Sequence, residues 1–84
     1  MYKVVIEKKV QKELSKITQP YFQNIIEALK SLALNPRPAG YKKLKGRPGY
    51  RIRIANYRII YILQENELLV LVLTIAHRKD IYEK

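Results

Sequence analysis

The spacing of apolar residues in the first half of the chain predicts one strand followed by two helices. Residues 2–7 form a short, mainly apolar run, which is typical of a strand. From residue 8 the apolar positions recur at intervals of four and three, as on one face of an amphipathic helix. These positions are Val10, Leu14 and Ile17. Residues 18–20 interrupt the helix with a proline, and a second helix is predicted to about Leu34. Its apolar stripe consists of Phe22, Ile25 or Ile26, Leu29 and Leu32. The short link predicts an antiparallel helical hairpin whose stripes pack in the core.

The second half of the chain predicts a loop and then three strands. Pro36 and Pro38 stop the second helix, and we expect a loop through residue 49. The next residues alternate apolar and basic up to a short polar break, and a second β-type run follows to a polar turn at 64–67. Residues 68–75 are apolar without alternation, so this last strand is either covered on both faces or lies with its second face against a partner chain.

The alternating stretch predicts a β-hairpin with Ala55 and Asn56 as its two-residue turn. Ile54 then pairs with Tyr57, and Arg53 lies opposite Arg58. Arg51, Arg53 and Arg58 share one face. Like charges across a strand pair are destabilising, so such a face indicates a bound anion, which we take to be phosphate.

Two alternatives to this interpretation stay open. Ala55 is a poor first residue for a tight type I′ turn, so the loop can be wider than two residues. A slip of one residue would move Arg58 to the face opposite Arg51 and Arg53. The other alternative is that the face is basic and merely solvated.

We therefore predict an α+β fold in the order β-α-α-β-β-β, with a helical hairpin packed on a small, mainly antiparallel sheet. The 84 residues are enough for a single domain, residues 1–84, with one shared core. The longest purely apolar run, residues 68–73, is too short to span a membrane, and the first residues do not begin a signal peptide. A cytoplasmic protein is the expectation.

Charge is the strongest global clue to function. The net charge is +10, and no acidic residue lies between Glu27 and Glu65. That interval contains Lys30, Arg37, Lys42, Lys43, Lys45, Arg47, Arg51, Arg53 and Arg58. One part of the molecule is therefore a positive field suited to nucleic acid phosphates. Within it, Lys42, Lys43, Lys45 and Arg47 are predicted to bind the phosphate backbone, or else form a charged loop without a function.

The residue types favour metal-free phosphodiester cleavage among enzyme reactions. The chain has no cysteine, one histidine and no acidic cluster, so we expect neither a metal nor another cofactor. In metal-free RNA cleavage the ribose 2′-OH attacks phosphorus, and arginines neutralise the charge that develops on the phosphate. Arginine does not readily transfer protons. His77 and Tyr82, together with the lysines, are the candidate proton carriers, although both also suit purely structural positions.

Four segments in order resemble the RelE family within the RelE/ParE toxin superfamily. They are residues 43–46 (KLKG), 49–54 (GYRIRI), 56–61 (NYRIIY) and 76–82 (AHRKDIY). The resemblance implies the fold predicted above and a ribosome-dependent endoribonuclease that cleaves mRNA in the decoding site. It also implies a cognate RelB-like antitoxin that neutralises the basic face. We expect this partner to be acidic and to use a helix.

The resemblance also implies roles for individual residues. Arg51 and Arg53 match the basic pair of the family's second strand, and Arg58 matches its phosphate-binding arginine. Arg78 would stabilise the leaving side, and Tyr82 would stack on or orient a base. His77 is our candidate proton carrier. The best-known pattern has lysines where this chain has Arg51 and Arg53, so proton transfer depends on His77, Tyr82 or a ribosomal group.

Two other functions compete with the nuclease. The similar ParE branch implies an inhibitor of DNA gyrase with the same fold and without nucleolytic chemistry. A non-catalytic RNA-binding module would also explain the charge and the tyrosines, but the sequence lacks the aromatic pair on adjacent strands of an RRM.

Overall fold

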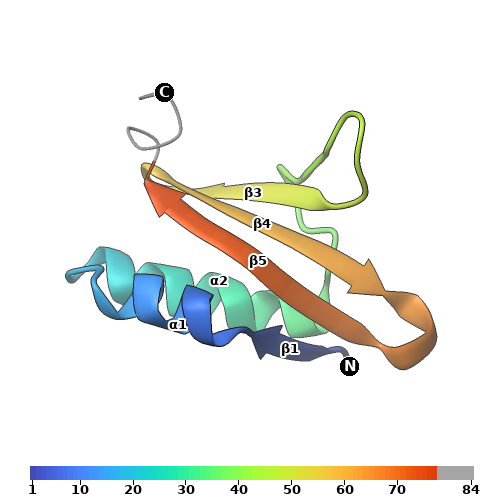
Figure 1. The fold of residues 1–84 in the computed structure, drawn as a ribbon, viewed down its shortest axis with the longest axis horizontal. Helices are drawn as coiled ribbons and strands as arrows, with labels where there is room; N and C mark the ends of the chain where they lie inside the picture. Colours follow the sequence, from blue (N-terminus) through green and yellow to red (C-terminus); the bar gives the residue numbers. More distant parts are fainter. Residues whose placement is uncertain (78–84) are drawn as a thin grey trace.

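The computed structural model describes residues 1–77 (Figure 1). Arg78 and Tyr82, two of the predicted site residues, lie outside the described residues. The elements in chain order are β1 (Lys3–Ile6), α1 (Lys8–Ser15), α2 (Tyr21–Leu34), β2 (Lys42–Lys43), β3 (Tyr50–Ile54), β4 (Tyr57–Gln64), the 3₁₀ turn η1 (Glu65–Glu67) and β5 (Leu69–His77). None of the described helices has the length and apolar content needed to cross a membrane.

Both helices lie on one face of the sheet and run in opposite directions, as the short link between them predicts (Figure 1). Val10 and Leu14 of α1 are buried, and the short helix ends at Ser15. Helix α2 contributes Ile25, Leu29 and Leu32, which lie three or four residues apart. The sheet completes this core with Ile52, Ile59, Tyr61, Val70, Val72 and Ile75.

The sheet has five strands in the order β1-β5-β4-β3-β2. Strand β1 is parallel to β5, and the other neighbours are antiparallel. The predicted α+β class and the mainly antiparallel sheet are confirmed. The predicted loop through residue 49 was wrong at Lys42 and Lys43, which form β2 against Arg51 and Tyr50. A two-residue strand of lysines has no apolar alternation that would reveal it in the sequence.

The predicted register of the β3–β4 hairpin is confirmed. Ile54 pairs with Tyr57, Arg53 with Arg58 and Arg51 with Ile60. Ala55 makes the two-residue turn possible by adopting a φ of +54°. A left-handed conformation costs an L-residue with a Cβ about 1–2 kcal/mol, so the hairpin forms despite its turn sequence. The pairing of the flanking strands and the burial of Ile52 and Ile59 outweigh that cost.

The strained turn predicts that Ala55→Gly stabilises the protein. Glycine adopts positive φ freely, and its greater freedom in the unfolded chain offsets part of the gain, so we expect about 0.5–1 kcal/mol. Thermal unfolding followed by circular dichroism should show a Tm higher by a few degrees. Asn56→Gly is the matched control: Asn56 is not among the described residues with positive φ, so this variant should lower the Tm. An unchanged or lower Tm for Ala55→Gly would contradict the strain.

Strand β5 lies between β1 and β4, and its pairing with β4 contains one irregularity. Val70, Val72 and Ile75 are buried under the helices. Ile60 pairs with Thr74 but Tyr61 pairs with Val72, so Leu73 is an extra residue in β5. The sequence does not alternate because the outer face of β5 is apolar as well, with Leu69 and Leu71 half-buried there. One predicted alternative was that β5 is covered on both faces. The described helices do not provide this cover, because they lie on one face only (Figure 1).

A cluster of polar and aromatic side chains ties the loop after α2 to the sheet. Arg37 Nη2 donates hydrogen bonds to the Tyr50 hydroxyl at 3.2 Å and to Glu65 Oε1 at 3.0 Å. The Tyr61 hydroxyl donates to the Pro36 carbonyl at 2.6 Å. The rings of Tyr50 and Tyr61 lie 5.8 Å apart. The loop therefore has defined attachments at Pro36 and Arg37, which fixes the path of the chain toward β2.

Burial raises the pKa of the Tyr61 phenol to about 12. In the unfolded chain a tyrosine titrates near pH 10, so the unfolded state loses this proton first. Stability contributed by the neutral phenol is therefore complete below about pH 10 and is lost as the pH rises toward 12. Tyr61→Phe should be less stable at pH 7 by about 1 kcal/mol, because the Pro36 carbonyl loses its donor.

Melting temperatures measured from pH 7 to pH 11 check this prediction. The Tm of Tyr61→Phe should fall less steeply above pH 10 than that of the wild type. The matched control is Tyr21→Phe, which removes a phenol from an exposed position and should keep the wild-type profile. Parallel alkaline profiles for the wild type and Tyr61→Phe would contradict the assignment.

Candidate nucleic-acid interface

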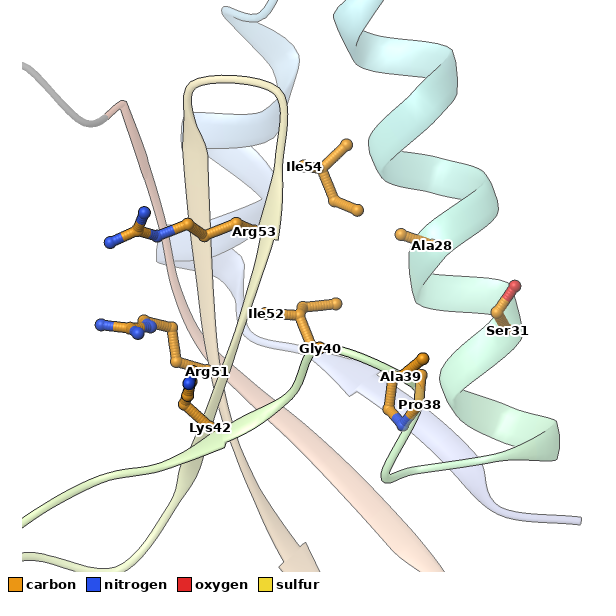
Figure 2. A pocket seen from close by; sticks show the side chains of 10 residues that line it. All are labelled: Ala28, Ser31, Pro38, Ala39, Gly40, Lys42, Arg51, Ile52, Arg53 and Ile54. Carbon is orange, nitrogen blue, oxygen red and sulfur yellow. The ribbon is translucent and has the colours of Figure 1, made fainter.

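Three arginines lie on the sheet face opposite the helices. Arg53 pairs with Arg58, and Arg51 pairs with Ile60, so these residues share a face. Their neighbours Ile52 and Ile59 are buried in the core on the other side. Figure 2 shows Arg51 and Arg53 projecting away from α2, whereas Ile52 and Ile54 project toward it. We call Arg51, Arg53 and Arg58 the arginine face. Arg53 is exposed, and Arg51 and Arg58 are half-buried.

The four predicted nucleic-acid-binding residues of the loop are distributed over different places. Lys42 pairs with Arg51 in the sheet and thus adds a fourth cation to the arginine face. Lys43 pairs with Tyr50 and belongs to the opposite face. Lys45 and Arg47 lie in the exposed turn between β2 and β3. The structure therefore joins Lys42 to the arginines, whereas Lys43 lies on the other face and Lys45 and Arg47 lie in the turn.

His77 does not lie on the arginine face. It pairs with Tyr57 at the end of β5, and the two rings make an edge contact with centroids 5.1 Å apart. Tyr57 packs against the helix-covered core, so His77 points to that side. With Glu13 of α1 and Lys16, the residue that follows α1, it lines a small hollow of about 330 Å³. The expectation that His77 lies near the arginines was wrong, because residue 76, not 77, shares the face of Arg58.

The same sheet face continues from the arginines into an apolar area. Ile62 pairs with Leu71, and Leu71 with Val5, which places these three side chains side by side. Ile60 and Leu69 extend the area along β4 and β5. All five are half-buried, and none belongs to the core under the helices. No described helix covers this apolar area, so it is available for a partner.

A cleft lies at the edge of β3 on the helix side. It has a volume of about 670 Å³ and is lined by Ala28, Ser31, Pro38, Ala39, Gly40, Lys42, Arg51, Ile52, Arg53 and Ile54. Figure 2 shows Ile52 and Ile54 facing α2 across the cleft. The rim is therefore basic and the interior is apolar. Sequence reasoning missed this cleft, because its walls come from a helix, a loop and a strand whose spacing only the fold sets.

The arginine face suits an extended polyanion. Guanidinium groups bind phosphate oxygens in a bidentate manner and keep their charge at every physiological pH. Four cations, from Arg51, Arg53, Arg58 and Lys42, converge on two neighbouring strand pairs. Beside the arginines, Lys42 is a side chain that can exchange a proton, which arginine does not readily do. The face can thus bind phosphate and stabilise developing negative charge.

Comparison with protein families identifies the class of this molecule. The family model described as "ParE toxin of type II toxin-antitoxin system, parDE" matches residues 4–82 of this chain. The chain belongs to this family of type II toxins. Its fold is that of the RelE toxins, as the following similarities show.

Known relatives and solved structures support this assignment along nearly the whole chain. The RelE1 protein of Methanocaldococcus jannaschii is 28% identical over 86 residues, which span 98% of this chain and 96% of the relative. The archaeal RelE–RelB complex from Pyrococcus horikoshii OT3 contains a chain with a TM-score of 0.83 and 28% identity, covering 92% of this chain and 94% of that one. The isolated Escherichia coli RelE toxin has a TM-score of 0.80 at 22% identity, covering 92% and 84%, and thus shares the fold.

Proposed function

We propose that this toxin is a metal-independent endoribonuclease that cleaves mRNA in the decoding site of the ribosome and thereby inhibits translation. The ribose 2′-OH attacks the adjacent phosphorus, and the protein aligns the reacting groups. The arginine face is the observation that carries this proposal. Because its proposed substrate is mRNA on the ribosome, we propose that the protein acts in the cytoplasm.

Each arginine has a defined place in the proposed reaction. Arg58 binds the non-bridging oxygens and stabilises the charge that develops in the transition state. Arg51 and Arg53 bind the phosphates on either side of the cleaved bond, with Lys42 beside Arg51. Arg78 stabilises the leaving side and Tyr82 orients a base; these two roles rest on the family resemblance. Lys43, Lys45 and Arg47 hold the flanking backbone.

His77 lies too far around the sheet to serve as the proton carrier, because it is on the face that the helices cover. Its ring contacts Tyr57 on the helix side, so we assign it a structural role at the end of β5 in place of proton transfer. Lys42 lies beside Arg51 on the arginine face. We therefore propose Lys42 or Tyr82 as the proton carrier, or a group of the ribosome.

We further propose that an acidic antitoxin covers the arginine face and the apolar area beside it. The solved neighbours from P. horikoshii and from the intact E. coli complex are RelE chains bound to RelB. In this chain an apolar area formed by Val5, Ile62 and Leu71 adjoins the arginine face. An amphipathic helix can bind both parts of that surface, with its apolar side on the apolar area and its acidic side on the arginines.

Inhibition of DNA gyrase is the second candidate function. The matched family model is described as ParE, of the parDE system, and the resemblance to that branch implies gyrase as a target. The phosphate-directed set of three arginines favours the nuclease, because inhibition of a protein does not require such a set.

Primer extension on a reporter mRNA in a purified translation system tests the proposal. Cuts at the decoding site that require both the toxin and ribosomes are the expected result. Omitting ribosomes is the control and should leave the mRNA intact. Intact mRNA in the complete system, combined with inhibition of gyrase supercoiling by the same preparation, would overturn the nuclease in favour of the second function.

A further inference from the structure

The outer edge of β1 is open. Strand β1 lies at one end of the sheet and pairs with β5 on its inner side, and no described strand pairs with its outer side. The chain stays extended as far as Glu7, which has a φ of −64° and a ψ of 157°. Residues 3–7 contain no proline and carry charge only at their two ends. An extended edge without such interruptions is able to pair with a further strand.

Two residues of β1 direct their backbone groups out of the sheet. The Lys3 N–H donates to the Leu68 carbonyl at 2.8 Å and therefore points toward β5. Because the direction alternates from residue to residue, the N–H and C=O groups of Val4 and Ile6 point outward. Gln11 Nε2 donates to the Ile6 carbonyl at 2.7 Å, which agrees with this direction. A carbonyl oxygen can accept two hydrogen bonds, so this contact leaves the Ile6 carbonyl able to accept another.

The ends of the helices limit how a further strand can lie along this edge. The Tyr2 N–H donates to the Ala33 carbonyl at 2.8 Å, so the end of α2 occupies the edge at that point. On the other side, helix α1 begins at Lys8. The open part of the edge is therefore residues 3–7, and its centre is Val5.

The sequence of residues 3–7, Lys-Val-Val-Ile-Glu, is complementary to itself in an antiparallel pair. With the centre at Val5, this residue lies opposite Val5 of a second copy, and Lys3 lies opposite Glu7 of that copy. The pair of opposite charges occurs twice, once at each end. Opposite charges directly across a strand pair are favourable, whereas a parallel pair in register would place lysine opposite lysine. Self-complementarity of this kind is what a two-fold symmetric dimer requires.

An apolar groove adjoins the same edge on the helix side. It has a volume of about 500 Å³ and lies between β1 and α2, with Val4, Ile6, Ile26, Leu29, Ala33 and Leu34 among its walls. The Leu34 side chain is 74% exposed. In the antiparallel pair Val4 lies next to Ile6 of the second copy on this side, so the two grooves meet across the axis. Burial of this apolar surface favours association.

Charge identifies a second copy as the occupant of this edge. Residues 3–7 carry one positive and one negative side chain, so an acidic strand would lie against Glu7 as well as Lys3. Strand β3, which holds two of the arginines, is three strands away from β1. This separation is about 14 Å and exceeds the Debye length of about 8 Å at physiological salt. The arginine face therefore does little to repel a second copy at this edge.

We propose that two copies of this chain associate through β1 as an antiparallel strand pair, with the two-fold axis at Val5. Val4 and Ile6 of each copy exchange backbone hydrogen bonds with Ile6 and Val4 of the other, and the two sheets become continuous. The axis is perpendicular to the sheet, so the helices of both copies lie on one face and both arginine faces lie on the other. Seven strand spacings, roughly 30 Å, separate the two β3 strands. This inference goes beyond the proposed function and does not depend on it.

Sedimentation equilibrium of the purified full-length chain tests the dimer through charge reversal. The wild type should form a dimer in a concentration-dependent manner. Lys3→Glu places like charges opposite each other at both ends of the pair and should weaken the dimer at least about tenfold. Glu7→Lys combined with Lys3→Glu restores opposite charges and should recover most of that loss. Lys3 and Glu7 lie four residues apart along one strand, about 13 Å, so this recovery reports contact between copies.

Net charge and folding are controlled separately. Lys3→Glu lowers the net charge of +10 by two, which by itself eases association, so a weaker dimer reports the strand pairing. Lys16→Glu makes the same change in charge at an exposed position after α1 and should not weaken the dimer. Thermal melts establish that each variant is folded.

Cysteine cross-linking tests the register of the pair. The chain contains no cysteine, so one introduced thiol can form a disulfide only with a second copy. Val5→Cys places two thiols at the axis, where the facing Cα atoms of a non-hydrogen-bonded pair are about 4.5 Å apart, within the range that a disulfide spans. Val4→Cys is the matched control, since Val4 lies on the other face and opposite Ile6. Oxidation should convert Val5→Cys, but not Val4→Cys, to a covalent dimer.

Three results would overturn this inference. The first is a wild type that stays monomeric up to about 1 mM. The second is a dimer that Lys3→Glu does not weaken or that the double variant does not restore. The third is a disulfide in Val4→Cys in place of Val5→Cys. None of these results changes the outcome of the mRNA cleavage assay, so failure of the dimer and failure of the nuclease are distinguishable.

Discussion

Replacing Arg58 by alanine should reduce mRNA cleavage by at least about 100-fold, the usual effect of removing one group that stabilises transition-state charge. Arg58 lies opposite Arg53 in the centre of the arginine face, so its charge has no substitute on the same strand. Primer extension in the purified translation system gives the rate, and growth of cells expressing the variant gives the toxicity. Cells that express Arg58→Ala should grow normally.

Two further variants separate the role of Arg58 from its place in the fold. Arg58 is half-buried, so its truncation can also lower stability, and the Tm of each variant has to be measured. Arg58→Lys keeps the charge but loses the bidentate geometry, and should retain part of the activity. Lys12→Ala removes a positive charge from the exposed surface of α1 and should cleave as the wild type does. Full toxicity of a folded Arg58→Ala would refute the role of Arg58 in the proposed reaction.

Replacing Gly49 by alanine should destabilise the protein by about 2–3 kcal/mol. Gly49 is buried at the start of β3 with a φ of +129°, a conformation that L-residues rarely adopt. A Cβ there would lie 3.2 Å from the Tyr61 carbonyl oxygen and 3.1 Å from Leu44 Cδ1. The backbone atom cannot move without disturbing β4. In a domain of this size such a loss lowers the Tm by more than about 10 °C.

Gly46→Ala is the matched control for this prediction. Gly46 also has a positive φ, +77°, but nothing lies within 4 Å of the position of its Cβ. It therefore carries the conformational cost without the steric one, and its Tm should fall by less than half as much. Differential scanning calorimetry of both variants measures the difference. Equal losses for the two variants would mean that the close approach to β4 contributes nothing.

The fold was predictable because each element has its own period in the sequence. Val10 and Leu14 on α1, and Ile25, Leu29 and Leu32 on α2, recur at helical spacing and are buried as that spacing requires. The alternation in β3 and the start of β4 set the register of the hairpin. Burial of Ile52 and Ile59 on one face obliges the arginines to take the other, whatever the turn sequence prefers.

The site was predictable only in part, because two of its features depend on contacts between distant segments. The bulge at Leu73 shifts the pairing of β4 with β5, and the pairing beyond it turns His77 toward Tyr57 and away from Arg58. Lys42 joins Arg51 because the loop is held by Arg37 and Tyr61. Neither effect leaves a periodic signal, since each arises from a single residue packed against a partner far along the chain.

The sequence by itself therefore determined the helices, the hairpin register and the charge of one face, because local periodicity and burial suffice for these. Tertiary structure alone decided which other side chains join the three arginines on that face. In the folded chain Lys42 lies beside Arg51, and His77 contacts Tyr57 on the face that the helices cover. The cleft between α2 and β3 likewise exists only in the folded chain. The physical reason is that the order of strands and the position of a bulge are set by long-range packing, and one residue of shift moves a side chain to the other face of the sheet.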